Sequence, residues 1–396
     1  MYTKAFIPYK GYYSTPFCKW QGSMANENAI SFSAETSKKW FAKKDFDVSN
    51  LDYLIFGNTI GQHHQFYSSP WAAALLEAKA LPAIAISQAC TTGATCINQA
   101  AMGIENGLYQ TPYVLTADRT SNGPHTIWPN PKGPGGEVIS ENWNMDNFNS
   151  DPNTGKKMVE TAENVARENK FTKQECDELV LRRYEQYLMA LENDREFQKR
   201  YMLRAEVKIS RKKSVLVEED EGIMASTKKG LAALKPLLPD GVLSFGTQTH
   251  PADGNAGVIV TTAEKAMELS SDKKITIQVV SYGYSREQRG YMPAAPVPAT
   301  QMALKNAGLS IKEINVIKTH NPFIVNDLFF SKKMGIDAFN FNNFGSSLIF
   351  GHPQGPTATR LIIEGIEETV MAGGGYFLWT GCAAGDCGAA LILKVS

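Results

Sequence analysis

Four side chains that can do chemistry lie in loops after predicted strands: Cys90, His320, His352 and Cys382. In α/β proteins, ligands bind in the crevice beyond the carboxyl ends of the strands, so these four are candidates for one shared site. A cysteine and a histidine brought together there make an activated nucleophile, because the imidazole accepts the thiol proton. Several glycines flank these residues, and glycine lets backbone N–H groups approach a ligand closely.

Cys90 lies where a strand changes into a helix. Ala83–Ser87 is a short apolar run that predicts a buried strand, and from Ala94 small and apolar residues recur with a helical period. Unpaired N–H groups and the positive dipole end at a helix start favour a thiolate, and they can hold an oxyanion. The alternative is that Cys90 is a small buried packing residue, as free cysteines often are. This stretch alone leaves both interpretations open.

The composition limits the classes of partner. The chain has 396 residues, enough for a large core or for two or three domains. Lys and Arg total 40 and Asp and Glu total 40, so nothing indicates nucleic acid or an anionic membrane as a partner. A surface without net charge is consistent with an oligomer.

The termini and cysteines indicate the compartment. The first residues lack the apolar region of a signal peptide, and no apolar segment approaches the roughly 18–20 residues that span a bilayer. The six cysteines have no CxxC spacing. We therefore expect a soluble cytoplasmic protein with reduced cysteines and no metal site.

Strands and helices alternate in two separate parts of the chain. Predicted strands at 51–57, 83–87 and 113–117 alternate with helices at 27–43 and 70–80. The rhythm resumes later, with strands at 275–282, 314–318, 338–342, 373–380 and 389–395 and a helix at 298–307. This alternation predicts an α/β fold with largely parallel sheets.

A long stretch of different character separates the two parts. Residues 118–156 are rich in Gly, Pro and Asn, and amphipathic helices are predicted at 158–169 and 172–193. Residues 195–213 are rich in Lys and Arg, which favours a solvated face, with a basic rim for a phosphorylated ligand as the alternative. We expect an amino-terminal half at 1–117 with about 222–266, an inserted loop domain at 118–221 and a carboxy-terminal half at 267–396.

Short motifs in a fixed order make the chain resemble the thiolase family along its whole length. The motifs include Thr15-Pro16-Phe17, Thr161-Ala162-Glu163-Asn164-Val165-Ala166, Asp253-Gly254, His320-Asn321-Pro322-Phe323, Gly351-His352-Pro353-Gln354-Gly355 and the turn from Cys382 to Gly388. The resemblance implies the thiolase fold, in which two similar α/β halves form five layers, αβαβα, with a large inserted loop domain.

The resemblance also implies roles for the four candidates. Cys90 would carry an acyl group as a thioester, and His352 would take its proton. Cys382 would move the α-proton of the acetyl-CoA unit, and His320 with His352 would polarise the thioester oxygen. The N–H groups of Cys90 and Ala384 would hold the acyl intermediate. Coenzyme A would be a substrate, with no permanently bound cofactor and no metal.

Departures from the family pattern lie on the substrate side. Asn321 and Pro322 stand where the family motif has a glutamate and an alanine. The resemblance implies that only Met158 would keep its contact with the pantetheine arm and that Thr249 would stand in for a serine near it. These changes predict an altered acyl pocket for a bulky, branched or aromatic chain, as in benzoylsuccinyl-CoA thiolase. Aromatic residues that favour it are Trp128, Trp143, Phe341, Phe344 and Phe350. The family implies a homodimer or homotetramer, and such relatives use a small zinc-ribbon/OB-fold partner subunit.

Two alternatives belong to other classes. A one-way condensing enzyme, such as a ketoacyl synthase or hydroxymethylglutaryl-CoA synthase, shares the fold but lacks the second catalytic cysteine, so Cys382 counts against it. A non-catalytic protein that binds acyl-CoA would not need four chemically capable residues.

Overall fold

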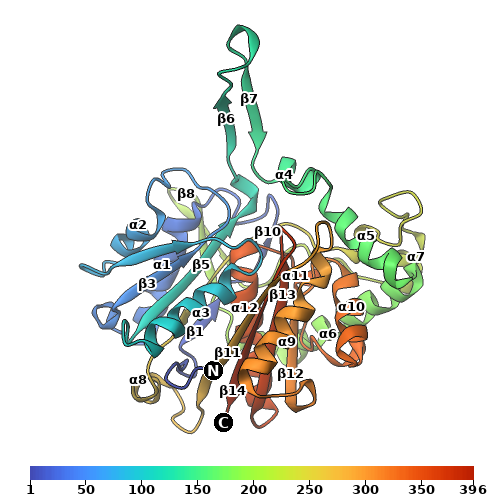
Figure 1. Cartoon of the computed structure of the whole chain (residues 1–396). Helices are drawn as coiled ribbons and strands as arrows, with labels where there is room; N and C mark the ends of the chain where they lie inside the picture. Colours follow the sequence, from blue (N-terminus) through green and yellow to red (C-terminus); the bar gives the residue numbers. More distant parts are fainter.

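Two mixed sheets organise the computed structural model, which describes residues 1–396 (Figure 1). The first sheet has the order β1 (Tyr12–Ser14), β10 (Ala252–Ile259), β5 (Pro112–Arg119), β3 (Tyr53–Gly57) and β4 (Ala83–Ile86), and β2 (Cys18–Lys19) also pairs with β10. The second has the order β11 (Ile277–Arg286), β14 (Cys387–Val395), β13 (Gly375–Ala383) and β12 (Ile314–His320). The strands of the second sheet all follow those of the first in the chain.

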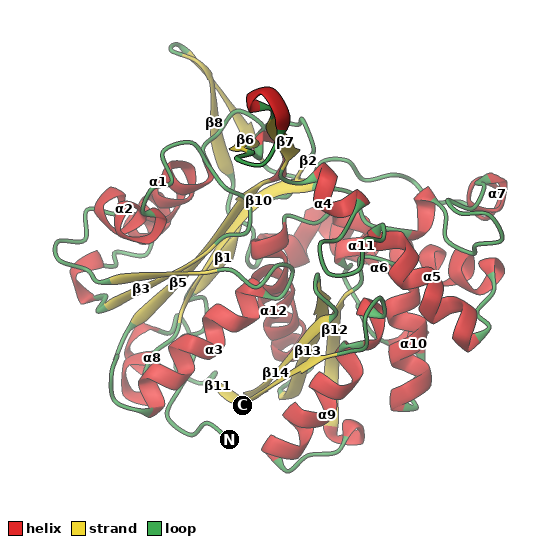
Figure 2. Cartoon of the chain, turned by 45° about the horizontal axis from the view of Figure 1, so that its top comes forward, coloured by secondary structure: helices red, strands yellow, loops and turns green.

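Helices on both faces of each sheet produce five layers (Figures 1 and 2). The middle layer is α3 (Thr92–Glu105) and α12 (Gln354–Met371), which pack on each other and on strands of both sheets. α1 (Ala29–Lys43) and α2 (Ser68–Leu75) cover the first sheet from outside, and α9 (Pro296–Ala307) with α10 (Ile324–Met334) flanks the second. Every residue of α12 from Gly355 to Thr369 is buried, as expected for a helix between two sheets.

The stretch between the halves contains smaller elements. A hairpin of β6 (His125–Pro129) and β7 (Val138–Asn142) stands away from the body (Figure 1), and β8 (Ala205–Ser210) pairs with β9 (Lys213–Val217). The helices here are α4 (Met145–Asn149), α5 (Met158–Asn169) and α6 (Lys173–Lys199), followed by α7 (Lys228–Ala233) and, after β10, α8 (Ala263–Leu269). α6 is interrupted at Glu192–Arg195, where the backbone leaves helical geometry. None of the helices combines the length and the apolar character that crossing a bilayer requires.

Three predictions about strands were wrong. The sheets are mixed and not largely parallel, since only the pairs β3–β4, β3–β5 and β12–β13 are parallel. β4 is a strand, but it lies at the edge of its sheet with only β3 as a partner, and Ile84 is 39% exposed. The segment 338–342 is not a strand and begins with a 3₁₀ turn at Ala338–Asn340. The Asp337 side chain accepts the N–H of Phe339 there, and Arg183 donates to the carbonyls of Ala338 and Phe341. Backbone groups satisfied in this way need no sheet partner.

The register of the second sheet brings two of the chemical residues to one edge. β12 and β13 are parallel, with His320 opposite Gly381, so His320 and Cys382 stand at the same end of neighbouring strands. A large apolar cluster made by both halves fixes this end against α3 and α12.

Candidate active site

The structure brings Cys90, His320, His352 and Cys382 together. One ligand atom each from Cys90, His320 and His352 lies within 4.8 Å of the other two, and the two imidazole centroids are 4.1 Å apart. Burial raises the pKa of the Cys382 thiol, and the nearby Cys90 sulfur raises it further. Cys90 precedes α3, His320 ends β12, His352 precedes α12 and Cys382 lies near the end of β13, so both halves contribute.

A tight turn presents Cys90. Ala89 has a positive φ of 44°, which is uncommon for a residue with a Cβ. The hydroxyl of Thr92 donates to the carbonyl of Ala89 at 2.7 Å and accepts the N–H of Gln88 at 2.8 Å. These two bonds hold the change of direction from β4 to α3, as the sequence pattern predicted for Cys90.

Burial decides the protonation state of Cys90. It raises the pKa of the thiol to about 12, while the N–H groups of Ala384 and of Cys90 itself act in the opposite direction. The expected preference for a thiolate is therefore wrong for the free protein, because the loss of solvation outweighs the helix start. Part of the Cys90 residue is exposed to solvent, whereas its sulfur atom is surrounded by protein. A protonated thiol needs a base before it can attack.

His352 is in the tautomer and the protonation state that such a base needs. Its Nδ1 lies 2.7 Å from the hydroxyl of Thr357, which itself donates to the carbonyl of Pro353 at 2.6 Å. Because the hydroxyl proton is already used, Thr357 accepts from Nδ1–H, and Nε2 keeps its lone pair. This Nε2 is buried without a hydrogen-bond partner. Burial, together with the ring of His250, lowers the pKa of His352 to about 3, so the imidazole is neutral.

The same logic fixes the tautomer of His320. Its Nδ1 lies 2.8 Å from the hydroxyl of Ser347, and that hydroxyl donates to Oδ1 of Asn321 at 3.2 Å. The amide of Asn321 is oriented on both sides: Nδ2 donates to Asp327 at 2.6 Å, and Oδ1 accepts the N–H of Leu348 at 3.1 Å. His320 therefore carries its proton on Nδ1, and its buried Nε2 has no partner. Burial, with His352 nearby, lowers the pKa of His320 well below its usual value.

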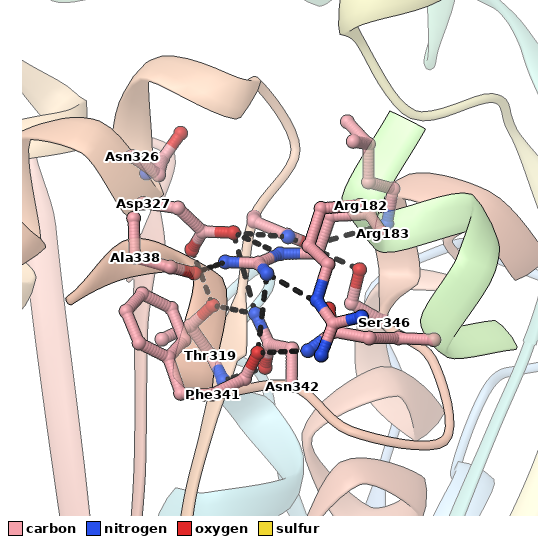
Figure 3. A network of polar contacts seen from close by, with 12 residues as sticks. Arg182, Arg183, Thr319, Asn326, Asp327, Ala338, Phe341, Asn342 and Ser346 are labelled. Carbon is pink, nitrogen blue, oxygen red and sulfur yellow. Dashed lines mark hydrogen bonds and ion pairs between the residues drawn. The ribbon is translucent and has the colours of Figure 1, made fainter. Parts of the chain in front are cut away.

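A buried polar network anchors this arrangement (Figure 3). The carboxylate of Asp327 accepts hydrogen bonds from Arg183 Nε at 2.9 Å, from the hydroxyl of Thr319 at 2.5 Å and from Asn342 Nδ2 at 3.3 Å. The guanidinium of Arg183 also lies 4.7 Å from the centre of the Phe341 ring. Arg183 belongs to α6 and Asp327 to α10, so the network ties the inserted stretch to the carboxy-terminal half.

Cys382 has its own polar neighbour, because Nδ2 of Asn326 lies 3.1 Å from its sulfur. Asn326, Ser347 and Thr357 were not among the residues predicted from the sequence. Asn326 stands three residues after Phe323, and its Oδ1 accepts the Phe323 N–H at 3.3 Å. The sequence Phe-x-x-Asn is not a capping-box pattern, so no local signal marked this residue. His250, which was predicted to be only a loop residue, also lies beside the site: its carbonyl accepts the N–H of His352 at 2.9 Å.

The predicted substrate-binding residues lie at three places. Ala384 is exposed in the turn between β13 and β14, and its N–H acts on the Cys90 sulfur. Thr249 donates its hydroxyl to the carbonyl of Ser347 at 2.5 Å and its N–H to the carbonyl of Pro322 at 2.8 Å. Met158 begins α5, half-buried against the main core.

Two of the aromatic residues expected at an acyl pocket are in the core. Phe341 and Phe350 are buried, with Arg183 over the first ring and Arg360 3.9 Å from the centre of the second. Phe344 stacks on Phe197. Trp128 and Trp143 are 45% and 39% exposed, in and beside the hairpin. Phe341 and Phe350 were therefore wrongly predicted to line an acyl pocket, because both rings are packed in the core.

The basic segment forms ion pairs. Arg195 pairs with Glu219 at 3.5 Å and Arg204 with Glu218 at 2.8 Å. These contacts favour the interpretation as a solvated, ion-paired surface.

Comparisons with known proteins agree on one family. Residues 11–264 match the family model described as thiolase, N-terminal domain, and residues 273–395 match thiolase, C-terminal domain. Acetyl-CoA acetyltransferase of Escherichia coli (strain K12) is 26% identical over 393 residues, covering 96% of each chain. Mitochondrial 3-ketoacyl-CoA thiolase of Homo sapiens is 29% identical over 238 residues, covering 60% of this chain and 59% of its own.

Solved structures confirm the predicted fold. Acetyl-CoA acetyltransferase of Bacillus anthracis superposes with a TM-score of 0.91 at 23% identity, covering 100% of this chain and 99% of that one. Human mitochondrial 3-ketoacyl-CoA thiolase in complex with CoA superposes with a TM-score of 0.89 at 24% identity, covering 99% and 98%. With both halves matched by family models and the five layers in place, the chain belongs to the thiolase family of acyltransferases.

Proposed function

We propose that the protein catalyses the CoA-dependent thiolytic cleavage of a 3-oxoacyl-CoA, or the reverse Claisen condensation, through an acyl-enzyme on Cys90. The observation that carries this proposal is the pairing of a protonated Cys90 thiol with a neutral His352 whose Nε2 is free to accept a proton. A second cysteine beside the first supports a reversible thiolase over a one-way condensing enzyme. The names of the relatives, acetyl-CoA acetyltransferase and 3-ketoacyl-CoA thiolase, support the same class.

In the cleavage direction, His352 Nε2 takes the Cys90 proton while the sulfur attacks the 3-oxo carbonyl. The N–H groups of Cys90 and Ala384 stabilise the oxyanion. The bond between C2 and C3 then breaks, leaving an acyl group on Cys90 and an acetyl-CoA enolate. Cys382 gives its proton to the enolate carbon. Free CoA then gives its thiol proton to the Cys382 thiolate and attacks the thioester carbonyl. The bond to the Cys90 sulfur breaks, Cys90 recovers its proton from His352, and the new acyl-CoA leaves.

The two histidines differ in how they serve the enolate oxygen. Once His352 has taken the Cys90 proton, its Nε2–H can donate to that oxygen. His320 presents an acceptor at Nε2 because its proton is on Nδ1. Its contribution therefore runs through a water molecule that donates one hydrogen to Nε2 and the other to the oxygen.

The acyl chain, assembly and compartment are parts of the same proposal. A bulky, branched or aromatic chain is supported by the changed motif residues Asn321 and Pro322. Acyl-CoA and CoA are the substrates, with no permanently bound cofactor. A homodimer or homotetramer is supported by the open edge of β4 and by the exposed apolar residues of the β6–β7 hairpin. The cytoplasm is the compartment that we propose for it. A small zinc-ribbon/OB-fold subunit is the further partner to test.

The experiment is a panel of straight, branched and aromatic 3-oxoacyl-CoAs with free CoA, followed by the loss of enolate absorbance. We expect turnover of at least one substrate and an acylated Cys90 in a mass spectrum. Cys90→Ser should abolish that thioester, whereas the matched variant Cys96→Ser, at a buried cysteine inside α3, should keep it. An acyl thioester that persists in Cys90→Ser would overturn the proposal. So would the absence of turnover of every substrate, with or without the small subunit.

A further inference from the structure

Three atoms that can bind a metal converge in the site: the Cys90 sulfur and one nitrogen each of His320 and His352. One ligand atom each from Cys90, His320 and His352 lies within 4.8 Å of the other two. Both Nδ1 atoms are engaged with hydroxyls, so Nε2 is the free nitrogen of each ring. Both Nε2 atoms are buried and have no partner, although buried polar atoms in proteins are nearly always hydrogen-bonded. A cation at this point would satisfy both.

The surroundings of the two rings suit metal binding. A histidine bound to a metal normally donates its other ring N–H to an oxygen, which fixes the tautomer and the ring orientation. Here Ser347 and Thr357 supply those oxygens at 2.8 and 2.7 Å. Both hydroxyls are themselves held, by Asn321 and by the carbonyl of Pro353.

The type and number of ligands select zinc. One thiolate and two imidazoles are the nitrogen and sulfur donors that Zn²⁺ prefers, whereas Mg²⁺ and Ca²⁺ prefer oxygen. Tetrahedral zinc with bonds of about 2.0–2.3 Å places neighbouring ligand atoms roughly 3.3–3.7 Å apart. The separations, none of which exceeds 4.8 Å, therefore need to shorten by at most roughly 1.1–1.5 Å to close the triad. Three protein ligands leave the fourth position to water.

We propose that Cys90, His320 and His352 form an inhibitory zinc site in the free enzyme. As the bond between zinc and sulfur forms, the Cys90 thiol loses its proton to solvent, and no group is oxidised or reduced. Zinc then occupies the lone pairs of both the nucleophile and the base, so acyl transfer stops until the metal is removed. The inhibition rests on the proposed function, whereas the metal site does not.

The direct test uses Co²⁺ as a coloured substitute for Zn²⁺, added to full-length enzyme freed of metal by a chelator that is then removed. We expect one equivalent to bind, with a thiolate-to-cobalt absorption band that Zn²⁺ abolishes by displacement. Cys90→Ser should lose the band, and His320→Asn and His352→Asn should each weaken binding at least tenfold. Cys387→Ser, which removes a half-exposed thiol elsewhere, should keep it. Thermal melts without metal establish that each variant is folded.

Activity of the same samples separates the two proposals. We expect Zn²⁺ at saturation to lower turnover at least tenfold, with recovery after EDTA. Active enzyme that binds no Co²⁺, or whose cobalt band survives Cys90→Ser, would overturn the zinc site and leave the thiolase proposal intact. Active enzyme that binds zinc at the triad without inhibition would overturn the inhibitory role. Enzyme that is inactive without metal but gives the cobalt band when Co²⁺ is added would support the metal site and count against thiolase function.

Discussion

The side-chain amide of Asn326 lies 3.1 Å from the sulfur of Cys382, at the first turn of α10. An N–H donor at this point stabilises the Cys382 thiolate and lowers a pKa that burial raises. Asn326→Ala should therefore slow the steps that need Cys382 by about 10–100-fold, since a hydrogen bond to a charged group contributes about 1.5–3 kcal/mol. The measurement is the exchange of the acetyl-CoA α-protons with deuterated water.

Acylation of Cys90 provides the internal control for this variant, because it does not need Cys382. Acyl-enzyme formation by rapid-quench mass spectrometry should stay within about threefold of the wild-type rate, and Asn326→Gln, which keeps an amide donor, should restore much of the exchange. Equal slowing of exchange and acylation would contradict a role specific to Cys382.

Ser347 determines which nitrogen of His320 carries the proton. Ser347→Ala removes the acceptor of Nδ1–H, so we expect a mixture of tautomers and about a tenfold fall in kcat with a smaller change in KM. Nitrogen-15 NMR of the imidazole reports the tautomer directly. Ser346→Ala is the matched control, because the Ser346 hydroxyl meets Asn321 and not His320. A wild-type His320 spectrum in Ser347→Ala would refute this role.

The ion pair between Arg183 and Asp327 is fully buried on both sides. Asp327→Ala leaves the guanidinium without its counter-charge and breaks the hydrogen bond to Asn321. We expect the free energy of unfolding to fall by about 3–5 kcal/mol, measured by urea denaturation. Glu77→Ala, which breaks the exposed pair with Lys38, should leave the urea midpoint nearly unchanged. Similar midpoints for both variants would mean that the buried network contributes little.

His352 should make the fold sensitive to acid. Burial lowers its pKa from 6.5 to about 3 in the folded protein, so below pH 6.5 the unfolded chain takes up a proton that the folded chain refuses. The unfolding free energy therefore falls as the pH drops from about 6.5 towards 3, and one such group removes about 2 kcal/mol between pH 7 and pH 5.

The comparison that isolates this effect is His352→Asn, which cannot titrate. The difference in unfolding free energy between pH 7 and pH 5 should be about 2 kcal/mol smaller in the variant than in the wild type. Parallel pH dependences in the two proteins would show that His352 titrates normally when folded.

The fold and the four chemical residues could be predicted because their signals are local. A strand before Cys90 and a helix after it leave a pattern in adjacent residues, and so does the glycine-rich segment around His352. The edge position of β4 left no such signal, because the exposure of Ile84 depends on which strand lies beside it. The segment 338–342 has strand-like residues, but Arg183, far away in the chain, satisfies its carbonyls.

The protonation states could not be predicted for the same reason. The pKa of Cys90 is set by burial between elements of both halves, and the sequence revealed only the helix start that opposes it. The tautomer of His320 depends on Ser347 and Asn321, which the folded chain brings together from separate loops. Such details follow from packing, which leaves no pattern in neighbouring residues.

The pairing of β5 with β10 has a consequence for synthesis of the chain. Arg119 pairs with Asp253 and Tyr113 with Ile259, so β5 leaves the ribosome 134 to 146 residues before its neighbour. At about 5–20 residues per second, the edge of β5 that β10 will occupy stays open for roughly 7–30 s. An unpaired strand edge exposed for that time invites pairing with other chains. We therefore expect the nascent amino-terminal half to depend on chaperones until residue 259 has emerged, and rapid translation to favour soluble yield.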